Sequence, residues 1–179
     1  MKLCSKMIFL FLIIISLLNF NLPIKDIQII QNDVKELGDV GRLYIPSINI
    51  SVRLYAVKSH NDGKRAQKYT DWSDSAAYCS SFDGGCGYIA DHYNQGFISI
   101  INCQINCLAY IKTRENIFVY RCVKITEGYN MEKYLCTKEG ESLKNINWAD
   151  ICCYTCNGNW KNIYMVFFKH LLTIPIKGE

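Results

Sequence analysis

Apolar residues follow two different spacings along the chain, which separate a helical start from a strand-rich remainder. Between residues 25 and 37 apolar side chains recur every three or four positions, which predicts one amphipathic helix, and Gly38 is a plausible stop. Residues 42–48 and 51–57 are continuous apolar runs rich in Ile, Val, Leu and Tyr, and they predict two strands. Pro46 indicates an edge position or a kink in the first strand.

The middle of the chain alternates polar connections with short apolar runs. Residues 59–74 are polar and charged, which predicts a loop, with a short helical turn over 74–78. A short buried strand is expected at 88–90. Residues 106–112 and 117–125 are apolar-rich and flank a four-residue polar connection, so they predict a hairpin.

The last third begins with a polar stretch and ends with two apolar runs. Residues 126–150 contain two glycines and scattered charges, and they predict a long excursion of a kind that is usually functional or mobile. Final strands are expected at 151–156 and 162–169. About seven strands with little helix and no internal repeat predict a mostly β protein with a mixed or closed β-barrel.

The composition fits a globular protein of one ordinary domain, with two as the outside alternative. The chain has 179 residues, of which 50% are hydrophobic and 20% charged, so it can bury a core and disorder is excluded as its main state. Its formal charge is +4, with no run of five or six like charges. Nucleic acid is therefore not an implied partner.

The N-terminal segment sets the expected compartment. Lys2 and Lys6 precede an apolar run over residues 7–24, at the lower limit of the roughly 20 residues that cross a bilayer. A small-x-small cleavage site is missing around residues 19–24, which favours a retained anchor over a cleaved signal peptide or a core helix. The positive-inside rule then puts everything after Lys25 outside the cytoplasm.

Ten cysteines are many for this length, and nine of them follow the anchor. In an oxidising exterior an odd number leaves one thiol free or intermolecular, whereas a cell without oxygen could keep all nine reduced. Pairing stays open, and Cys79 with Cys86 is the candidate bridge.

Zinc has to be considered, because two cysteine groups and a histidine could supply four ligands: Cys103-x3-Cys107, Cys152-Cys153-x2-Cys156 and His170. Structural zinc sites usually have paired knuckles on tight turns, whereas Cys152 and Cys153 are adjacent and point to opposite faces of a strand. We therefore expect no metal. The alternative interpretation makes four cysteines small apolar core or sheet positions: Cys103, Cys107, Cys122 and Cys152.

The candidate chemistry lies at two strand ends. His92 follows a short apolar strand and precedes a turn signal, and Cys156 is placed in the same way. A thiol attacks carbonyls as thiolate, and a neighbouring imidazole both favours the thiolate and can protonate a leaving amine. The pair is a candidate nucleophile and general acid; the alternative for His92 is a structural or surface histidine.

The order of these features resembles the sortase family of Gram-positive cysteine transpeptidases. Residues 153–156, Cys-Tyr-Thr-Cys, resemble the family's Thr-x-Thr-Cys strand end. Residues 89–92, Ile-Ala-Asp-His, resemble its strand ending in a small residue, Gly and His, with Asp91 in place of Gly. Residues 41–48 are similar to the family's opening strand, and the match covers residues 41–169.

This resemblance implies a mixed eight-stranded β-barrel with an N-terminal helix and short helical turns, and a class B-like subclass. It divides the chain into a signal anchor, an amphipathic helix, a catalytic domain and a C-terminal tail at residues 1–24, 25–40, 41–170 and 171–179. The protein is expected to be single-pass in the cell membrane, with its catalytic domain extracytoplasmic.

The resemblance also implies a reaction. Cys156 would attack a backbone carbonyl in the sorting peptide of a secreted protein, and His92 would protonate the departing amine. An amino group of a peptidoglycan precursor or a pilin would then resolve the thioacyl enzyme. No cofactor is expected, because the sequence has no phosphate-binding Gly loop and this chemistry needs no metal.

One departure concerns the arginine that sortases carry at the start of the final strand, where it stabilises the oxyanion. Here Lys161 and Asn162 stand there, and no arginine follows Arg121. Asn162 could donate through its amide and Lys161 could supply positive charge. Thr155 and Trp160 are the candidate substrate contacts, with a buried core aromatic as the alternative for Trp160.

The missing arginine keeps a second function open: a catalytically weakened member of the fold that binds wall peptides or protein partners through the same groove. Losing one oxyanion donor costs on the order of 100- to 1000-fold in rate. An L,D-transpeptidase or a papain-like hydrolase is disfavoured, because the first needs a Ser-His-Gly-Cys stretch and the second places its Cys before its His.

Overall fold

The computed structural model describes residues 24–33, 36–58, 63–81, 84–131, 134–156 and 162–176. The chain divides into two compact units, Met1–Asp33 and Val34–Glu179, and each is described by itself. The expected anchor at residues 7–24 lies, apart from its last residue, outside the described residues. Within the described part of the chain, no helix is both long and apolar enough to cross a membrane.

The first unit contains one described helix, α2 (Ile24–Gln31). It begins where the apolar spacing predicts but ends six residues before the predicted end. Its last turn is tightened by a bond in which the Asp33 N–H donates to the Ile30 carbonyl at 3.3 Å. Asn32 and Asp33 stop the helix because their short polar side chains compete for backbone hydrogen bonds.

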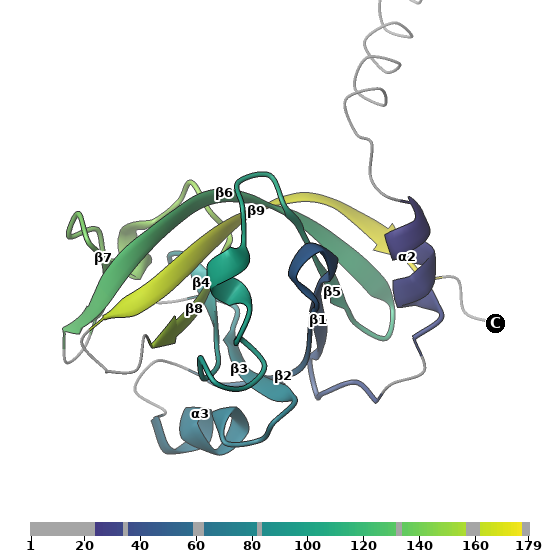
Figure 1. Ribbon diagram of the computed structural model, residues 1–179, viewed down its shortest axis with the longest axis horizontal. Coiled ribbons are helices and arrows are strands. Elements are labelled where there is room, and N and C mark those ends of the chain that lie inside the picture. The colour runs from purple at the N-terminus through teal and green to yellow at the C-terminus, as the bar shows by residue number, and fades with distance from the viewer. Residues whose placement is uncertain are drawn as a thin grey trace, which may run out of the picture. The chain divides into compact units, whose positions relative to one another are not determined.

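The second unit is a β-barrel. Its strands are β1 (Gly41–Ile45), β2 (Ile50–Ala56), β3 (Ser75–Cys79), β4 (Gly87–Ala90), β5 (Leu108–Lys112), β6 (Asn116–Met131), β7 (Tyr134–Thr137), β8 (Ile151–Cys156) and β9 (Ile163–Pro175). The strand order is β5-β1-β2-β3-β4-β8-β9-β6-β7, and a further β5–β6 pairing closes eight strands into a ring, with β7 added at the side of β6 (Figure 1).

The barrel is mixed, because β2 pairs with β3 and β4 pairs with β8 in parallel while the other ladders are antiparallel. The predicted eight-stranded mixed barrel is therefore confirmed. Pro46 ends β1 and opens the short 3-10 helix η1 (Pro46–Ile48). Asn49 follows with a positive φ of 56°, and the chain returns directly into β2.

Residues expected to form a loop contain a helix instead. The helix α3 (Gly63–Thr70) lies outside the barrel against β3 (Figure 1). A parallel β2–β3 pair needs a crossover connection, and α3 supplies it. Its sequence is mostly polar, so the apolar spacing was too weak to predict it; Tyr69 anchors it by stacking on Tyr55 of β2, with ring centroids 4.8 Å apart.

Three further expectations are corrected. The helical turn expected at 74–78 is strand β3, which pairs on both sides with β2 and β4. Much of the excursion expected at 126–150 is ordered: β6 continues to Met131, β7 pairs with it, and η3 (Leu143–Asn145) follows. The expected tail from residue 171 begins as strand, because β9 continues along β6 to Pro175.

The sheet wall separates two hydrophobic clusters. The inner cluster joins side chains from strands around the ring, among them Leu43, Leu54 and Phe168. The outer cluster lies on the other face of β3, β4, β8 and β9, under Tyr69 of α3 and Leu143 of η3. Strand alternation assigns each residue to one side, because successive side chains of a strand point to opposite faces.

Replacing Leu54 by Ala tests the inner cluster. Leu54 is fully buried, so Leu54→Ala is expected to lower the free energy of unfolding by about 2–5 kcal/mol. Val123 is exposed on β6, and Val123→Ala is expected to change the free energy of unfolding by less than about 0.5 kcal/mol. Urea unfolding of the two variants measures both values, and equal losses would contradict the assignment of Leu54 to the core.

Candidate active site

Two parallel strands bring His92 and Cys156 together. In the ladder between β4 and β8, Ala90 is paired with Tyr154. The Asp91 N–H extends the ladder by donating to the Tyr154 carbonyl at 3.4 Å. Two residues beyond the pair on each strand, His92 is level with Cys156, although 64 positions separate them in the sequence.

Both side chains open into one cavity on the outer side of the barrel. The cavity has a volume of about 360 Å³, and both His92 and Cys156 line it. Ala90 of β4 and Tyr154 of β8 form part of its floor, which agrees with strand alternation because they lie two positions before His92 and Cys156. Cys156 and His92 are each half-buried, so the thiol and the imidazole both reach solvent.

The walls come from elements that the sequence pattern did not predict. Helix α3 contributes Gln67 and Thr70, and the β6–β7 hairpin contributes Asn130 and Leu135. Asn130 places an amide side chain on that hairpin wall, and its backbone is paired with Leu135 across the hairpin. These residues were missed because α3 was expected to be a loop and β7 was expected to be part of an excursion.

Asp71, at the end of α3, contacts the candidate general acid. Its Oδ1 lies 3.7 Å from His92 Nε2, with the carboxylate largely exposed and the histidine side chain 26% exposed. This carboxylate can fix the orientation of the imidazole ring. In the sequence Asp71 stands in a polar stretch with several other charged residues, and nothing in that stretch distinguishes it.

Asp91 occupies the position at which the resembled motif has glycine. It is 4% exposed, and its Oδ1 accepts a hydrogen bond from the His92 backbone N–H at 2.7 Å. Burial raises the pKa of Asp91 to about 7, against the opposing effect of backbone N–H groups of His92, Gly96 and Phe97. Its carboxylate therefore holds the backbone of His92 rather than its ring.

Gly96 makes room for this carboxylate. A Cβ at Gly96 would collide with Asp91 Oδ2 and with Val52 Cγ1. The turn after His92 therefore closes directly over the buried carboxyl group. The larger residue at position 91 is accommodated by the absence of a side chain at position 96.

The position across from Cys156 carries no polar group. In the β8–β9 ladder Cys156 is paired with Ile163, and Ile163 lines the cavity. Asn162, expected to help at the oxyanion, is exposed just before β9 and does not line the cavity. Lys161 and Trp160 lie outside the described residues.

Thr155 is not part of the cavity wall. It is 1% exposed and adjacent to Cys156 on β8, so its side chain points to the opposite face of the sheet, toward the barrel interior. The expected contact of Thr155 with substrate is not tested by this cavity and stays a prediction. The same alternation places Cys153 in the inner cluster and Cys152 in the outer one.

Cys79 and Cys86 are not joined by a disulfide, so the expected bridge between them is wrong. In the β3–β4 ladder Tyr88, not Cys86, stands opposite Cys79. The two thiols bond elsewhere, Cys79 to the Ser81 carbonyl and Cys86 to the Gly87 carbonyl. Burial raises the pKa of Cys86 to about 12, which keeps it a neutral thiol.

Of the zinc ligands considered from the sequence, Cys103 and Cys107 lie together, whereas Cys156 and His170 lie elsewhere. Among the described residues, three cysteines form the group with metal-ligand spacing: Cys103, Cys107 and Cys122. Cys156 lies at the cavity instead, and His170 bonds through Nε2 to Thr173 Oγ1 at 3.1 Å.

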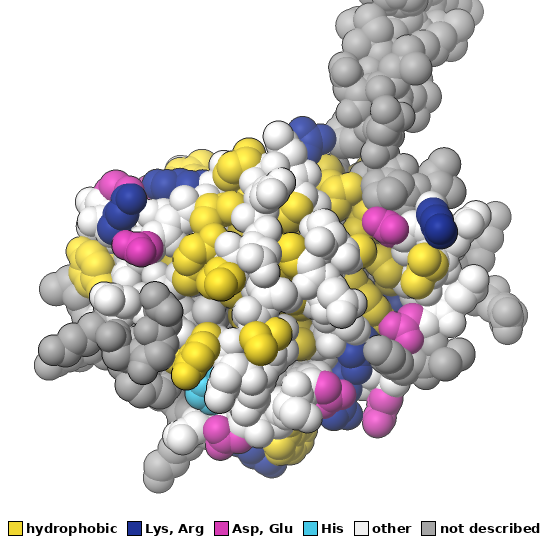
Figure 2. Space-filling view, in the orientation of Figure 1, with side chains coloured by type: hydrophobic (Ala, Val, Ile, Leu, Met, Phe, Trp, Pro, Cys, Tyr) yellow, Lys and Arg dark blue, Asp and Glu magenta, His cyan; other side chains and the backbone are white. Residues whose placement is uncertain are grey.

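The connection between β4 and β5 presents apolar side chains beside the cavity. Tyr93 follows His92 directly and is 47% exposed, and Ile98 and Ile101 are exposed further along. Figure 2 shows hydrophobic side chains at several places on the face that carries this connection. A partner that enters the cavity from this side would meet an apolar border.

No protein-family model matches the chain, and no curated protein matches it. Solved structures do match. Sortase A of Listeria monocytogenes aligns with a TM-score of 0.56 at 14% identity, covering 77% of this chain and 90% of that one. The chain has the sortase fold.

Two further sortase structures agree with this result. Sortase E1 from Streptomyces coelicolor, solved with a tripeptide in its active site, aligns with a TM-score of 0.55 at 16% identity, covering 78% of this chain and 91% of that one. Sortase C-3 from Streptococcus pneumoniae aligns with a TM-score of 0.55 at 15% identity, covering 81% of this chain and 67% of that one. These are types E and C, and the class B-like subclass stays a prediction.

The buried carboxyl group gives this sortase-fold protein a pH-dependent stability. The folded pKa of Asp91 lies above its ordinary value near 3.8, so the folded state binds the proton more tightly. The contribution of Asp91 to the free energy of unfolding is therefore complete below about pH 4 and is lost as the pH rises toward 7. Asp91→Asn is expected to flatten this decline.

Urea midpoints at pH 5 and pH 8 measure the effect in wild type and Asp91→Asn. The wild type should lose more stability between the two pH values than the variant does. Parallel losses in both proteins would show that Asp91 does not titrate in this way.

Proposed function

We propose that this protein is a membrane-anchored, sortase-like cysteine transpeptidase that cleaves a sorting peptide and joins a surface protein to the cell wall or to a pilin. The observation that carries the proposal is the common cavity of His92 and Cys156, placed level on adjacent parallel strands of a sortase fold. A half-buried thiol beside an imidazole is suited to acyl transfer.

Cys156 is the proposed nucleophile. Its thiolate adds to a backbone carbonyl of the bound peptide, and the tetrahedral intermediate collapses to a thioester when the C–N bond breaks. His92 gives its proton to the departing amine, which otherwise leaves poorly. An incoming amine from a peptidoglycan precursor or a pilin then attacks the thioester and gives its proton to His92. The new C–N bond forms as the C–S bond breaks, which releases the Cys156 thiolate.

Asp71 is the proposed positioning residue for His92. The 3.7 Å approach of its carboxylate to Nε2 limits the rotation of the ring. Asp91 acts on the same residue from the other side by accepting the backbone N–H. Side chain and backbone of His92 are thus each held by one carboxyl group.

Asn130 is the proposed donor to the oxyanion. Its side chain is exposed, like that of Asn162, but Asn130 lines the cavity, where Ile163 occupies the position directly across from Cys156. Asn162 precedes β9 at an exposed position, and Lys161 stands before it, so both remain proposed contributors from the neighbouring connection. An amide N–H can donate to a developing oxyanion but lacks the charge and the planar fork of an arginine.

The surroundings fit a peptide substrate. The cavity is lined mostly by apolar residues with a few polar side chains, as is common for binding sites. The tripeptide in the active site of the Streptomyces sortase E1 supports a peptide ligand for this fold. The apolar run at residues 7–24 supports an anchor that keeps the catalytic domain at the outer surface of the cell membrane.

A thioester on Cys156 is the direct test of the proposal. The protein is incubated with a library of sorting-type peptides and examined by intact mass spectrometry, with Cys156→Ala as the inactive variant. Cys136→Ala is the matched control, because Cys136 is also a free thiol but does not line the cavity. Wild type and Cys136→Ala should gain a peptide adduct.

Identical spectra for wild type and Cys156→Ala with every peptide would remove the enzymatic proposal. The second candidate function, a weakened sortase-fold protein that binds wall peptides or protein partners, is favoured by the aliphatic Ile163 across from Cys156. It predicts equal peptide binding by both proteins, with no adduct on either.

The variants Asn130→Ala and Asn162→Ala distinguish which of the two side-chain amides donates to the oxyanion. If Asn130 donates to the oxyanion, kcat/KM should fall by about 100-fold or more, chiefly through kcat. For Asn162→Ala, the matched variant outside the cavity, kcat/KM should fall by less than about tenfold. Steady-state rates with the best peptide from the library measure both, and the reverse order would transfer the role to Asn162.

A further inference from the structure

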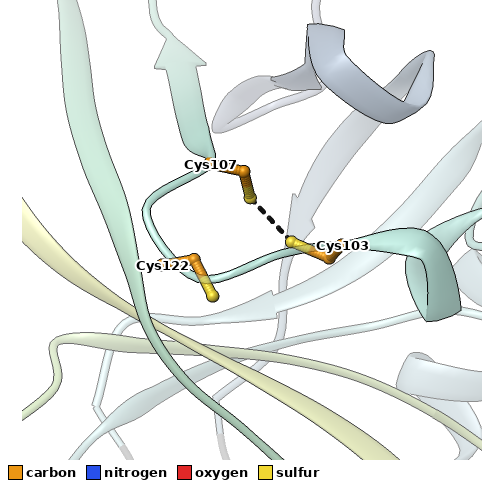
Figure 3. A group of neighbouring side chains, drawn as sticks. All are labelled: Cys103, Cys107 and Cys122. Carbon is orange, nitrogen blue, oxygen red and sulfur yellow. Dashed lines mark hydrogen bonds between the residues drawn. The ribbon is translucent and has the colours of Figure 1, made fainter.

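Three cysteines lie together away from the proposed active site. Cys103 follows the short 3-10 helix η2 (Ile100–Asn102), Cys107 immediately precedes β5, and Cys122 lies on β6 (Figure 3). Their sulfur atoms are all within 4.8 Å of one another. Cys103 and Cys122 are buried and Cys107 is half-buried, so Cys107 is the member that solvent reaches.

The backbone holds this arrangement in place. Asn106 has a positive φ of 71°, and its N–H donates to the Cys122 carbonyl at 2.9 Å. The Cys122 N–H donates in turn to the Cys107 carbonyl at 2.9 Å. The Cys107 N–H closes a turn onto the Gln104 carbonyl at 3.1 Å, and this turn directs Cys107 back toward Cys103.

The distance between two of the sulfur atoms distinguishes a dithiol from an ion site. Cys103 Sγ and Cys107 Sγ are 2.7 Å apart. Two thiolates on one tetrahedral zinc, with Zn–S bonds of about 2.3 Å, would be separated by about 3.8 Å. A disulfide needs about 2.05 Å, so the two sulfur atoms are closer to bond formation than to sharing an ion.

The cluster also has the acid–base arrangement that thiol chemistry needs. Hydrogen bonds from Cys103 and then from Cys122 lower the pKa of Cys107 to about 4. The bond to Cys107 raises the pKa of Cys103, which stays a neutral thiol. The half-buried Cys107 is therefore the thiolate, and its nearest neighbour Cys103 carries the proton.

We propose that Cys103 and Cys107 form a redox-active dithiol that is converted to an intramolecular disulfide by low-molecular-weight disulfides. The Cys107 thiolate attacks a small disulfide, RSSR, forming Cys107–S–S–R and releasing RS⁻. Cys103 then attacks the Cys107 sulfur, displacing the second RS⁻, and its proton goes to a released thiolate. The pair of one thiolate and one thiol loses two electrons and one proton, and RSSR becomes RSH and RS⁻.

Cys122 is the supporting thiol in this proposal. It donates to the Cys107 thiolate and remains reduced when the disulfide forms. The disulfide would tie together the two ends of the turn that leads into β5, at the far end of the connection that begins at His92. None of these steps depends on the proposed transpeptidase activity.

The test is a redox titration of the full chain with oxidised and reduced glutathione, followed by acid quenching, alkylation and peptide mapping. Cleavage after Phe97 and Tyr110 isolates residues 98–110, which hold both cysteines. Oxidation should make this peptide lighter by two hydrogen atoms and protect both cysteines from alkylation. Cys136, which lies on β7 and is not a member of this cluster, should alkylate throughout.

The variants assign the roles. Cys103→Ser and Cys107→Ser should abolish the loss of two hydrogens. Cys122→Ala should keep the disulfide but slow its formation severalfold at pH 4, because a rise in the pKa of Cys107 from about 4 leaves less thiolate at that pH, and Cys122→Ser should restore the rate.

Three results would overturn the proposal. Cys103 and Cys107 could remain alkylatable at every glutathione ratio, or the disulfide could include Cys122. Protein purified without oxygen could also contain one equivalent of metal that is lost in Cys122→Ser, which would identify the cluster as an ion site instead.

Discussion

The parallel pairing of β4 with β8 is the constraint on which the site depends. These strands are separated by the β5–β6–β7 part of the chain, and only the barrel brings them side by side. Parallel neighbours end at the same edge of a sheet, so whatever follows them meets there. A one-residue slip would turn Cys156 toward the barrel interior and Thr155 toward the cavity, so the register decides which side chain meets His92.

Several features of this arrangement could be predicted from the residues. Continuous apolar runs marked most strands, and strand alternation correctly placed Cys152 and Cys153 on opposite faces. The strand ends at Ala90 and Cys156 were visible because turn residues follow them. The resemblance then supplied the barrel order, which periodicity alone does not contain, and the solved sortase structures bear out the fold.

The parts that could not be predicted depend on contacts between distant segments. Helix α3 has a mostly polar sequence, and its position depends on the β2–β3 crossover and on the stacking of Tyr69 on Tyr55. Asn130 reaches the cavity only because β6 continues past the barrel to pair with β7. The cluster of three cysteines joins Cys103 and Cys107, which precede β5, to Cys122 on β6. Sequence spacing paired Cys103 with Cys107 but gave no reason to add Cys122.

The division of the apolar residues by the sheet wall has an evolutionary consequence. The inner cluster stabilises the barrel, while the cavity is built from outward-facing positions and from α3 and the β6–β7 hairpin. Substitutions at the exposed wall positions Gln67 and Asn130 leave both clusters intact, so lineages can exchange ligand preference there at little risk to folding. Leu135 and Ile163 also line the cavity but are buried in the outer cluster. Inward-facing positions lack that freedom, and the scaffold can therefore stay constant while its recognition surface diversifies.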